Sequence, residues 1–180
     1  LFYIGSGTSG RLGVLDASEC PPTFCCSSET VQGIISGGIP SLTTSSESIE
    51  DNSQLAISNL KDKNFTKNDV LIGITASGRT PYVVAALNYS KSINALTISI
   101  SSVPDKDSII SSDIDIRLLT GPEIIAGSTR LKAGTATKMA LNIISTSVMI
   151  KLGKVYDNRM IDLSVSNEKL LHRALGILLD

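Results

Sequence analysis

The chain has 180 residues, a length that fits one compact domain. Its 16 basic and 17 acidic residues nearly cancel, and no basic run stands out, which argues against a surface that binds DNA or RNA. No apolar run approaches the roughly 20 residues that a membrane span requires. The composition therefore favours a globular domain that binds neither nucleic acid nor a membrane.

The three cysteines, Cys20, Cys25 and Cys26, lie close together, and no second cluster is present to complete a zinc site. We therefore expect no bound metal, and reduced thiols in a cytoplasmic protein. The sequence starts directly in an apolar segment without an initiator methionine and ends inside an apolar, helix-like pattern. We interpret it as part of a longer protein.

Short apolar runs alternate with longer amphipathic ones, a pattern typical of a parallel sheet covered by helices on both faces. From the N-terminus we expect a strand at residues 1–4 and a helix at residues 11–20, which Pro21 and Pro22 should end because proline lacks an N–H group. An apolar run at residues 31–35 and a helix at residues 46–61 follow.

The second half of the chain continues the pattern. Strands are expected at residues 70–74, 95–100 and 114–118, and Thr80-Pro81 is a typical helix start between the first two. A helix at residues 132–152 is apolar nearly all round, as in central, buried helices, and Gly153 suits the position after its end. A last helix is expected at residues 167–179. The sequence predicts one α/β domain with a helical tail.

Three loops are rich in small residues: residues 5–11 and 75–80, each directly after a strand, and residues 127–135, before the long helix. The tripeptide Ser-Gly-Arg occurs in the first two. Glycine lets the backbone approach a ligand, serine and threonine supply hydroxyl groups, and a following helix offers backbone N–H groups and a positive dipole end. Each loop alone is as well explained by a tight turn. The three together favour a phosphate site at the carboxyl edge of the sheet.

A dinucleotide site is the alternative, because residues 5–10 fit the pattern G-x-G-x-x-G. Such a site needs an acidic residue about 20 positions further on, after a second strand. Glu19 lies too early, and Glu29 follows Pro21 and Pro22 in a segment of cysteine and serine. The pattern therefore gives little support to a dinucleotide.

The run GTSGRLGVLDASECPPTF at residues 7–24 resembles a characteristic motif of N-acetylmuramic acid 6-phosphate etherases. These are sugar isomerase (SIS) domain proteins related to the glucokinase regulatory protein of animals. Further matching stretches follow in family order, at residues 31–35, 76–82, 127–135 and 167–170. The resemblance implies a three-layer sandwich with a central, mainly parallel sheet flanked by helices. It also implies an SIS domain over residues 1–155, a helical C-terminal tail over residues 156–180, and a homodimer.

The family cleaves the D-lactyl ether of N-acetylmuramic acid 6-phosphate to N-acetylglucosamine 6-phosphate and D-lactate, without metal or other cofactor. In the open-chain sugar the C2 hydrogen is acidic because it lies next to the C1 aldehyde. A base removes it, an acid protonates the departing lactate oxygen, and water then adds at C3. Two carboxyl groups, one ionised and one protonated, suit this chemistry.

By resemblance, Glu19 would be the proton donor and Glu50 the base or water activator. From the residues alone, each glutamate is better explained as a solvated helix side chain. Phosphate would bind at Thr8, Ser9, Ser77, Gly78 and Thr80, and Glu123, Ser128 and Lys132 would complete the sugar pocket. The sequence departs from the family at Ser48-Ile49, directly before Glu50, where Gly-Ala is more usual.

Two other functions remain open. A sugar-phosphate sensor like the glucokinase regulatory protein would bind the phosphosugar and change the activity of a partner without catalysis. An aldose–ketose isomerase would exchange the C2 proton without releasing lactate. The presence of both glutamates favours the etherase, because a sensor needs no acid–base pair.

Overall fold

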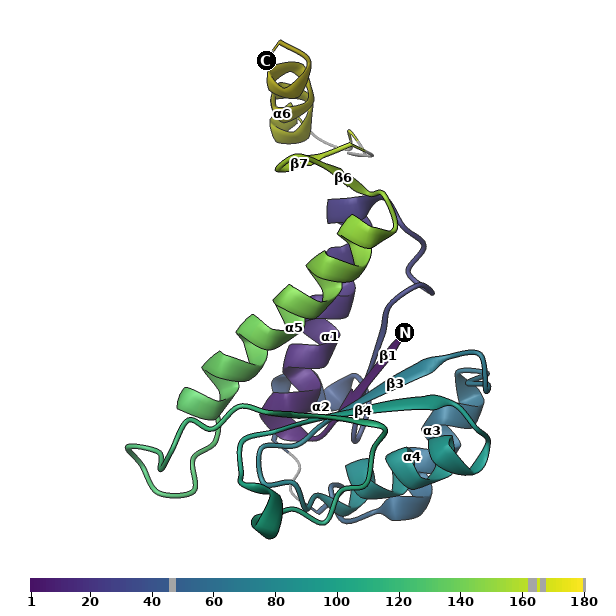
Figure 1. Cartoon of the computed structure of the whole chain (residues 1–180), viewed down its shortest axis with the longest axis vertical. Helices are drawn as coiled ribbons and strands as arrows, with labels where there is room; N and C mark the ends of the chain where they lie inside the picture. The colour runs from purple at the N-terminus through teal and green to yellow at the C-terminus, as the bar shows by residue number, and fades with distance from the viewer. Residues whose placement is uncertain (46–47, 162–164, 166–167, 180) are drawn as a thin grey trace.

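The computed structural model describes residues 1–45, 48–161, 165 and 168–179, and its centre is a five-stranded parallel sheet (Figure 1). Its strands are β1 (Phe2–Gly5), β2 (Gln32–Ile35), β3 (Val70–Ile74), β4 (Leu96–Ser101) and β5 (Ile114–Arg117). They lie in the order β2-β1-β3-β4-β5, and every neighbouring pair is parallel. The predicted parallel α/β fold is confirmed.

Helices cover both faces of this sheet. One face carries α1 (Gly7–Phe24) and α5 (Lys132–Lys151), which pack against each other. The other carries α3 (Ser53–Asp62) and α4 (Pro81–Ser92), also in mutual contact. The short elements α2 (Pro40–Thr43) and η1 (Asp105–Asp107) lie in connections. After α5 the chain forms the hairpin β6 (Val155–Tyr156) and β7 (Arg159–Met160) and then α6 (Glu168–Leu179). Within the described residues, no helix combines the length and apolarity that a bilayer span demands.

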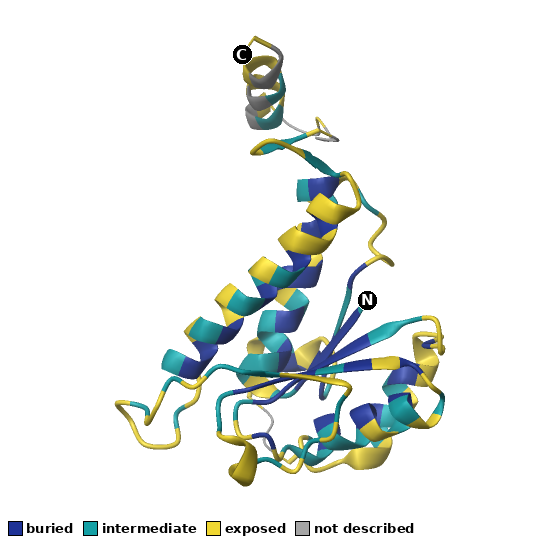
Figure 2. Ribbon diagram, in the orientation of Figure 1, coloured by how far each residue is buried: buried dark blue, intermediate teal, exposed yellow. Residues whose placement is uncertain are grey.

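Strand β1, which lies between β2 and β3, is buried on both sides because it separates two hydrophobic cores (Figure 2). Phe2 and Ile4 belong to the core under α3 and α4, where the Phe2 ring meets Phe65 edge-on at 5.2 Å. Tyr3 belongs to the core under α1 and α5. Strands buried on both faces are uniformly apolar, which explains why the strands could be predicted from short apolar runs.

The strand order places a crevice at one edge of the sheet. The chain passes from β1 to β2 on one side and continues at β3 on the other side of β1. Because the connections after β1 and β3 lead to opposite sides, the two loops separate at the carboxyl edge of the sheet. Open α/β sheets bind ligands at such a position. The first two of the three small-residue loops follow these two strands.

Helix α1 is anchored to its surroundings by Asp16, a buried carboxylate. One oxygen accepts a hydrogen bond from the Tyr3 hydroxyl of β1 at 2.9 Å. The other accepts from Asn142 Nδ2 at 2.7 Å and from Ser145 Oγ at 3.2 Å, both on α5. One side chain thus joins the sheet to both helices of this layer. Burial, reinforced by this carboxylate, raises the pKa of Tyr3, so its hydroxyl stays protonated as a donor.

Two of the expected element boundaries and one expected burial pattern are wrong. Helix α1 does not end before Pro21 and Pro22 but runs to Phe24, because the two prolines fall near its end and burial of Phe24 holds the last turn. The helix expected from residue 46 begins only at Ser53, where the Asn52 side chain accepts from the Leu55 N–H group. Helix α5 is not buried all round, because one side is exposed to solvent (Figure 2).

We predict that Asp16→Ala lowers the free energy of unfolding by about 3 kcal/mol, because it removes the acceptor of three hydrogen bonds, two of them from the buried residues Tyr3 and Ser145. Tyr3→Phe removes one of these bonds and should cost about 1 kcal/mol. Urea denaturation measures both. Asp62→Ala, at an exposed carboxylate, is the control and should change stability by less than about 0.5 kcal/mol. A similar loss in the Asp16 and Asp62 variants would contradict the anchoring role.

Candidate functional site

The loops after β1 and β3 begin side by side at the carboxyl edge of the sheet, because Gly5 pairs with Ile74 in the parallel register. Thr8 and Ser9 lie in the first turn of α1 and are half-buried. Ser77, Gly78 and Thr80 lie between β3 and α4. The structure therefore brings together the five residues expected to bind phosphate on two neighbouring loops.

A hydroxyl cluster organises the second of these loops. The Thr75 hydroxyl lies 2.9 Å from the Thr80 hydroxyl and 3.3 Å from that of Ser77. Ser77 Oγ also accepts from the Arg79 N–H group at 3.2 Å. Thr80 is the residue before α4, yet its hydroxyl is used in this cluster and makes no capping bond to the helix. The three hydroxyls converge next to the start of a helix, an arrangement suited to an anion.

Sequence reasoning missed a group of hydroxyls at the same edge. The hydroxyl oxygens of Ser6, Ser101 and Ser102 are buried and have no hydrogen-bond partner in the described part of the chain. Ser6 follows β1, and Ser101 and Ser102 stand at the end of β4, where the Ser102 N–H group donates to the Ala76 carbonyl. Their position at or directly after the end of a strand was the signal available in the sequence. Buried hydroxyls without a partner are unusual and can be satisfied by a ligand.

Glycines shape both loops by permitting close contact. A Cβ atom on Gly5 would lie 2.7 Å from the Gly10 backbone nitrogen, so β1 and α1 can meet this closely only without side chains. Gly78 has φ of +66°, and a Cβ there would lie 2.6 Å from Ser108 Oγ. The outer glycines of the G-x-G-x-x-G pattern therefore serve strand–helix packing. After β2, where a dinucleotide site needs a carboxylate, the chain has Ser36 and Gly37.

The arginines of the two Ser-Gly-Arg tripeptides hold neighbouring loops in place. Arg11 donates through Nε to the Leu42 carbonyl at 3.1 Å and through Nη2 to the Thr44 carbonyl at 3.3 Å. Arg79 Nε donates to the Asp107 carbonyl at 2.7 Å. Each guanidinium thus ties its own loop to a neighbouring connection.

Glu50 lies beside the β3–α4 loop, although not on the helix expected for it. It is exposed, in a turn before α3, and its backbone carbonyl accepts from the Tyr82 N–H group at 3.0 Å. Tyr82 is the second residue of α4, two positions beyond Thr80. The backbone of Glu50 is therefore fixed against the start of the helix that the hydroxyl cluster precedes.

Glu123 caps the start of α5. Its two carboxylate oxygens accept from the N–H groups of Lys132 and Ala133, each at 2.9 Å. These backbone hydrogen bonds, to Ala133 above all, lower the pKa of Glu123. The start of α5 also meets α1, since a Cβ on Gly134 would lie 3.4 Å from the Thr8 methyl group.

Ser128 and Lys132, both half-buried, belong to the same end of α5. A hollow of about 560 Å³ lies beside it and includes Arg130 and Lys132 in its lining. The third small-residue loop is thus adjacent to the other two through the contact between α5 and α1.

Glu19 is the one expected site residue that the structure places elsewhere. It is exposed in the fourth turn of α1, ten residues beyond Ser9. At about 1.5 Å per residue, this is about 15 Å along the helix axis, away from the carboxyl edge of the sheet. Within one chain, Glu19 is not grouped with Glu50 and the hydroxyl-rich loops.

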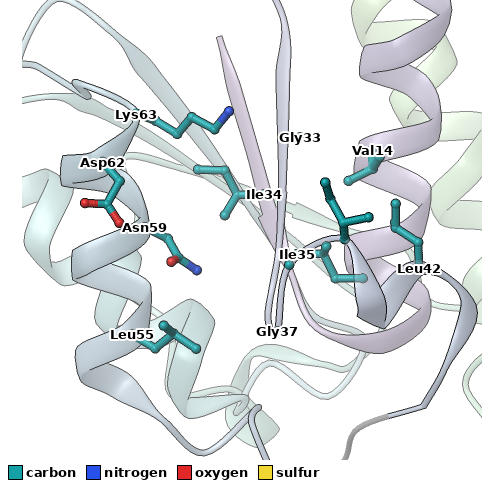
Figure 3. Close-up of a pocket in the computed structure, with 12 residues that line it drawn as sticks. Val14, Gly33, Ile34, Ile35, Gly37, Leu42, Leu55, Asn59, Asp62 and Lys63 are labelled. Carbon is teal, nitrogen blue, oxygen red and sulfur yellow. The ribbon is translucent and has the colours of Figure 1, made fainter.

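A separate cavity of about 510 Å³ lies on the other side of α1, at the edge strand β2 (Figure 3). It is bounded by α1, β2, α2 and α3, with Val14, Ile34 and Leu55 among its apolar residues and Asp62 and Lys63 near one end. None of the expected site residues lines it.

The described cysteines are free thiols. Burial, followed by the nearby Asp16 carboxylate, raises the pKa of Cys20 to about 12, so this thiol is protonated at neutral pH and unsuited to nucleophilic attack. In the described ranges, no group of three or more histidine, cysteine or acidic residues is arranged to hold a metal ion.

Comparisons with known proteins show what the chain is similar to. Residues 1–91 match the family model described as glucokinase regulatory protein N-terminal SIS domain. The whole chain is 81% identical to part of the N-acetylmuramic acid 6-phosphate etherase of Prochlorococcus marinus strain NATL2A, of which it covers 58%. The etherase of Crocosphaera subtropica is 62% identical over 178 residues, again 58% of its length. The chain thus spans little more than half the length of the curated relatives it matches.

Solved structures share the fold at low sequence identity. A protein of E. coli CFT073 superposes with a TM-score of 0.61 at 16% identity, over 87% of this chain and 72% of that one. The Vibrio vulnificus NanR protein complexed with ManNAc-6P gives a TM-score of 0.55 at 13% identity, over 99% of this chain and 54% of its own. These likenesses show the fold.

We predict that Glu123→Gln destabilises the protein at neutral pH, because an amide is a weaker acceptor than a carboxylate at a helix start. Since the folded-state pKa of Glu123 is lowered, its contribution is present above the unfolded pKa and is lost as pH falls through the folded pKa. Thermal unfolding of both proteins at pH 7 and pH 3 measures this, and the Tm difference should shrink at pH 3. A difference independent of pH would contradict the role of the charge.

Proposed function

The chain belongs to the family of the glucokinase regulatory protein N-terminal SIS domain, and from its curated relatives we propose that the protein is an N-acetylmuramic acid 6-phosphate etherase. The observation that supports this most strongly is 81% identity to an etherase over all 180 residues. The substrate would be a phosphorylated amino sugar, consistent with the hydroxyl-rich loops at the carboxyl edge of the sheet. We assign the SIS domain to residues 1–155 and a helical tail to residues 156–180.

In this proposal the phosphate binds between the loops after β1 and β3. Thr8 and Ser9 contribute from α1, and Ser77, Gly78 and Thr80 contribute from the start of α4. Hydroxyl groups and the positive ends of two helices together favour a phosphate group. Ser128 and Lys132 lie at the start of α5, and Lys132 adds a positive charge at the edge of this site.

The chemistry follows from the open-chain sugar. Removal of the C2 proton by Glu50 gives the enolate of the C1 aldehyde. The C3–oxygen bond then breaks as Glu19 protonates the lactate oxygen, and the C1 aldehyde is restored. Water then adds at C3 of the unsaturated aldehyde and a proton returns to C2, giving N-acetylglucosamine 6-phosphate and D-lactate. The backbone hydrogen bond that holds Glu50 at the start of α4 supports this role. Glu123 serves the site indirectly, by holding the start of α5.

We predict that the full-length gene product releases D-lactate from N-acetylmuramic acid 6-phosphate and that Glu50→Gln lowers kcat about 100-fold or more, with little change in KM. An enzymatic D-lactate assay measures this, and Asp51→Asn, at the exposed neighbouring residue, is the control. A folded protein that binds the phosphosugar and releases no lactate would be a sensor. Exchange of the C2 proton without lactate release would indicate an isomerase.

We further propose a cytoplasmic homodimer. The free thiols are consistent with a reducing compartment. Met139, Ile143 and Ile150 of α5 are 59%, 64% and 51% exposed, and they fall on one side of the helix at spacings of four and seven residues. An apolar stripe of this kind on an exposed helix is typical of a protein interface.

Sedimentation equilibrium should therefore give twice the mass of one chain, and Ile143→Lys should shift the protein towards monomer because it places a charge in the stripe. Asn88→Lys, at an exposed position of α4 in the opposite layer, is the control and should leave the mass unchanged. A wild-type protein that is monomeric at micromolar concentration would contradict the homodimer.

A further inference from the structure

Ser6 and Ser101 carry hydroxyl groups that the fold buries without giving them a partner. The oxygen of each is buried and makes no hydrogen bond to any residue that the structure describes, and Ser101 as a whole is only 1% exposed. Ser102 shares this property but lies beyond the end of β4, where the strand register no longer fixes its direction. A buried hydroxyl costs free energy unless it is hydrogen-bonded, so a ligand that pairs with it gains affinity.

The parallel register places Ser6, Thr75 and Ser101 side by side, because each directly follows one of three residues that are paired across β1, β3 and β4. Side chains alternate between the two faces of a sheet, and the backbone of Ser6 is still extended. Ile4, two residues before Ser6, lies in the core under α3 and α4, whereas Ile100, directly before Ser101, lies in the core under α1 and α5. Both serines therefore face the α3–α4 side. We call Ser6, Thr75 and Ser101 the hydroxyl row.

Thr75 connects this row to the proposed phosphate site. Its hydroxyl lies 2.9 Å from the Thr80 hydroxyl and 3.3 Å from the Ser77 hydroxyl, both of which belong to that site. Ser6 leads into the β1 loop, three residues before Ser9. The hydroxyl row therefore lies at the base of both loops that are proposed to bind phosphate.

The two helices that begin at this crevice both start with a hydroxyl residue that does not cap them. Ser6 stands at the N-cap position of α1 and Thr80 at that of α4, yet neither side chain accepts a hydrogen bond from its helix. An N-cap hydroxyl normally accepts from a backbone N–H group of the first turn. The Ser6 hydroxyl is thus available to another partner, and the positive dipole ends of both helices favour an anion there.

We propose that Ser6 and Ser101 donate hydrogen bonds to the phosphate group of the substrate from the side of the sheet, and so contribute to selection of a phosphorylated sugar. This inference rests on the proposed function, because it takes the phosphate site from it. A phosphate group has three strong acceptor oxygens, so it can bind donors from the loops and from the sheet together. The arginines of the same loops, Arg11 and Arg79, donate to carbonyls of neighbouring connections, which leaves hydroxyls as the donors at the base of the site.

Thermal unfolding of the full-length gene product tests the free and the bound protein together. Ser6→Ala and Ser101→Ala each remove a buried hydroxyl without a partner, so neither should lower the Tm of the ligand-free protein. Inorganic phosphate should raise the Tm by binding the folded state, and each variant should lose part of this rise. The comparison is made at equal ionic strength. A lower Tm in the ligand-free variants would show that the hydroxyls have partners within the fold and would overturn the proposal.

Kinetics identify the group that the hydroxyls contact. Each substitution should raise KM for N-acetylmuramic acid 6-phosphate about 10-fold, because a hydrogen bond to a charged group is lost. The value of kcat should change little, because the phosphate is held equally in the ground state and in the transition state. The inhibition constant of inorganic phosphate should rise by a similar factor. Wild-type values of KM would overturn the proposal, and so would a higher KM with an unchanged constant for phosphate, since the hydroxyls would then contact the sugar.

Ser90→Ala is the matched control. Ser90 is also buried, but its hydroxyl donates to the Ala86 carbonyl at 2.9 Å, and it lies in the last turn of α4, away from the crevice. This substitution should leave KM and the effect of phosphate on the Tm unchanged. A response equal to that of the Ser6 and Ser101 variants would overturn the proposal, because removal of any buried hydroxyl would then have the same effect.

Failure of the proposed function gives a different result. A wild-type protein that releases no lactate, but whose Ser6 and Ser101 variants respond less to phosphate, would contradict the etherase and support the role of the two hydroxyls. An active etherase whose variants respond to phosphate as the wild type does would support the function and overturn this inference.

Discussion

The rigid placement of helix α1 is the constraint on which the rest of the structure depends. At its start, Gly5 and Gly10 let β1 and α1 approach to a distance that no side chain would permit. In its middle, Asp16 is hydrogen-bonded to the sheet and to α5, and at its end Phe24 is buried in the core. The helix therefore presents its first turn to the carboxyl edge of the sheet and carries everything after it away from that edge.

Features that depend on neighbouring residues could be predicted from the sequence. Strand β3 and helix α5 lie within one residue of their expected bounds, because a short apolar run and a long periodic one are local patterns. The hydroxyl-rich loops were also predictable, since each follows a strand and the sheet topology then brings them together. The left-handed φ of +74° at Gly153 agrees with its expected place after α5.

Features that depend on distant packing could not be predicted in the same way. Pro21 and Pro22 remain in α1 because burial of Phe24 outweighs the hydrogen bonds that proline removes. The backbone hydrogen bonds from Lys132 and Ala133 to Glu123 depend on the shape of the loop between them, and an irregular loop leaves no periodic pattern in the sequence. The exposure of one side of α5 could not be predicted either, because an apolar helix surface has the same sequence pattern whether it is covered or faces solvent.

The same distinction explains why the two glutamates differ. Glu50 is adjacent to the hydroxyl-rich loops through one backbone hydrogen bond, because the connection before α3 runs past the start of α4. Glu19 stands ten residues beyond Ser9 on the same straight helix, so the placement that brings Ser9 to the carboxyl edge carries Glu19 about 15 Å away from it. Sequence spacing shows neither relation, because the first depends on a loop contact and the second on the direction of a helix.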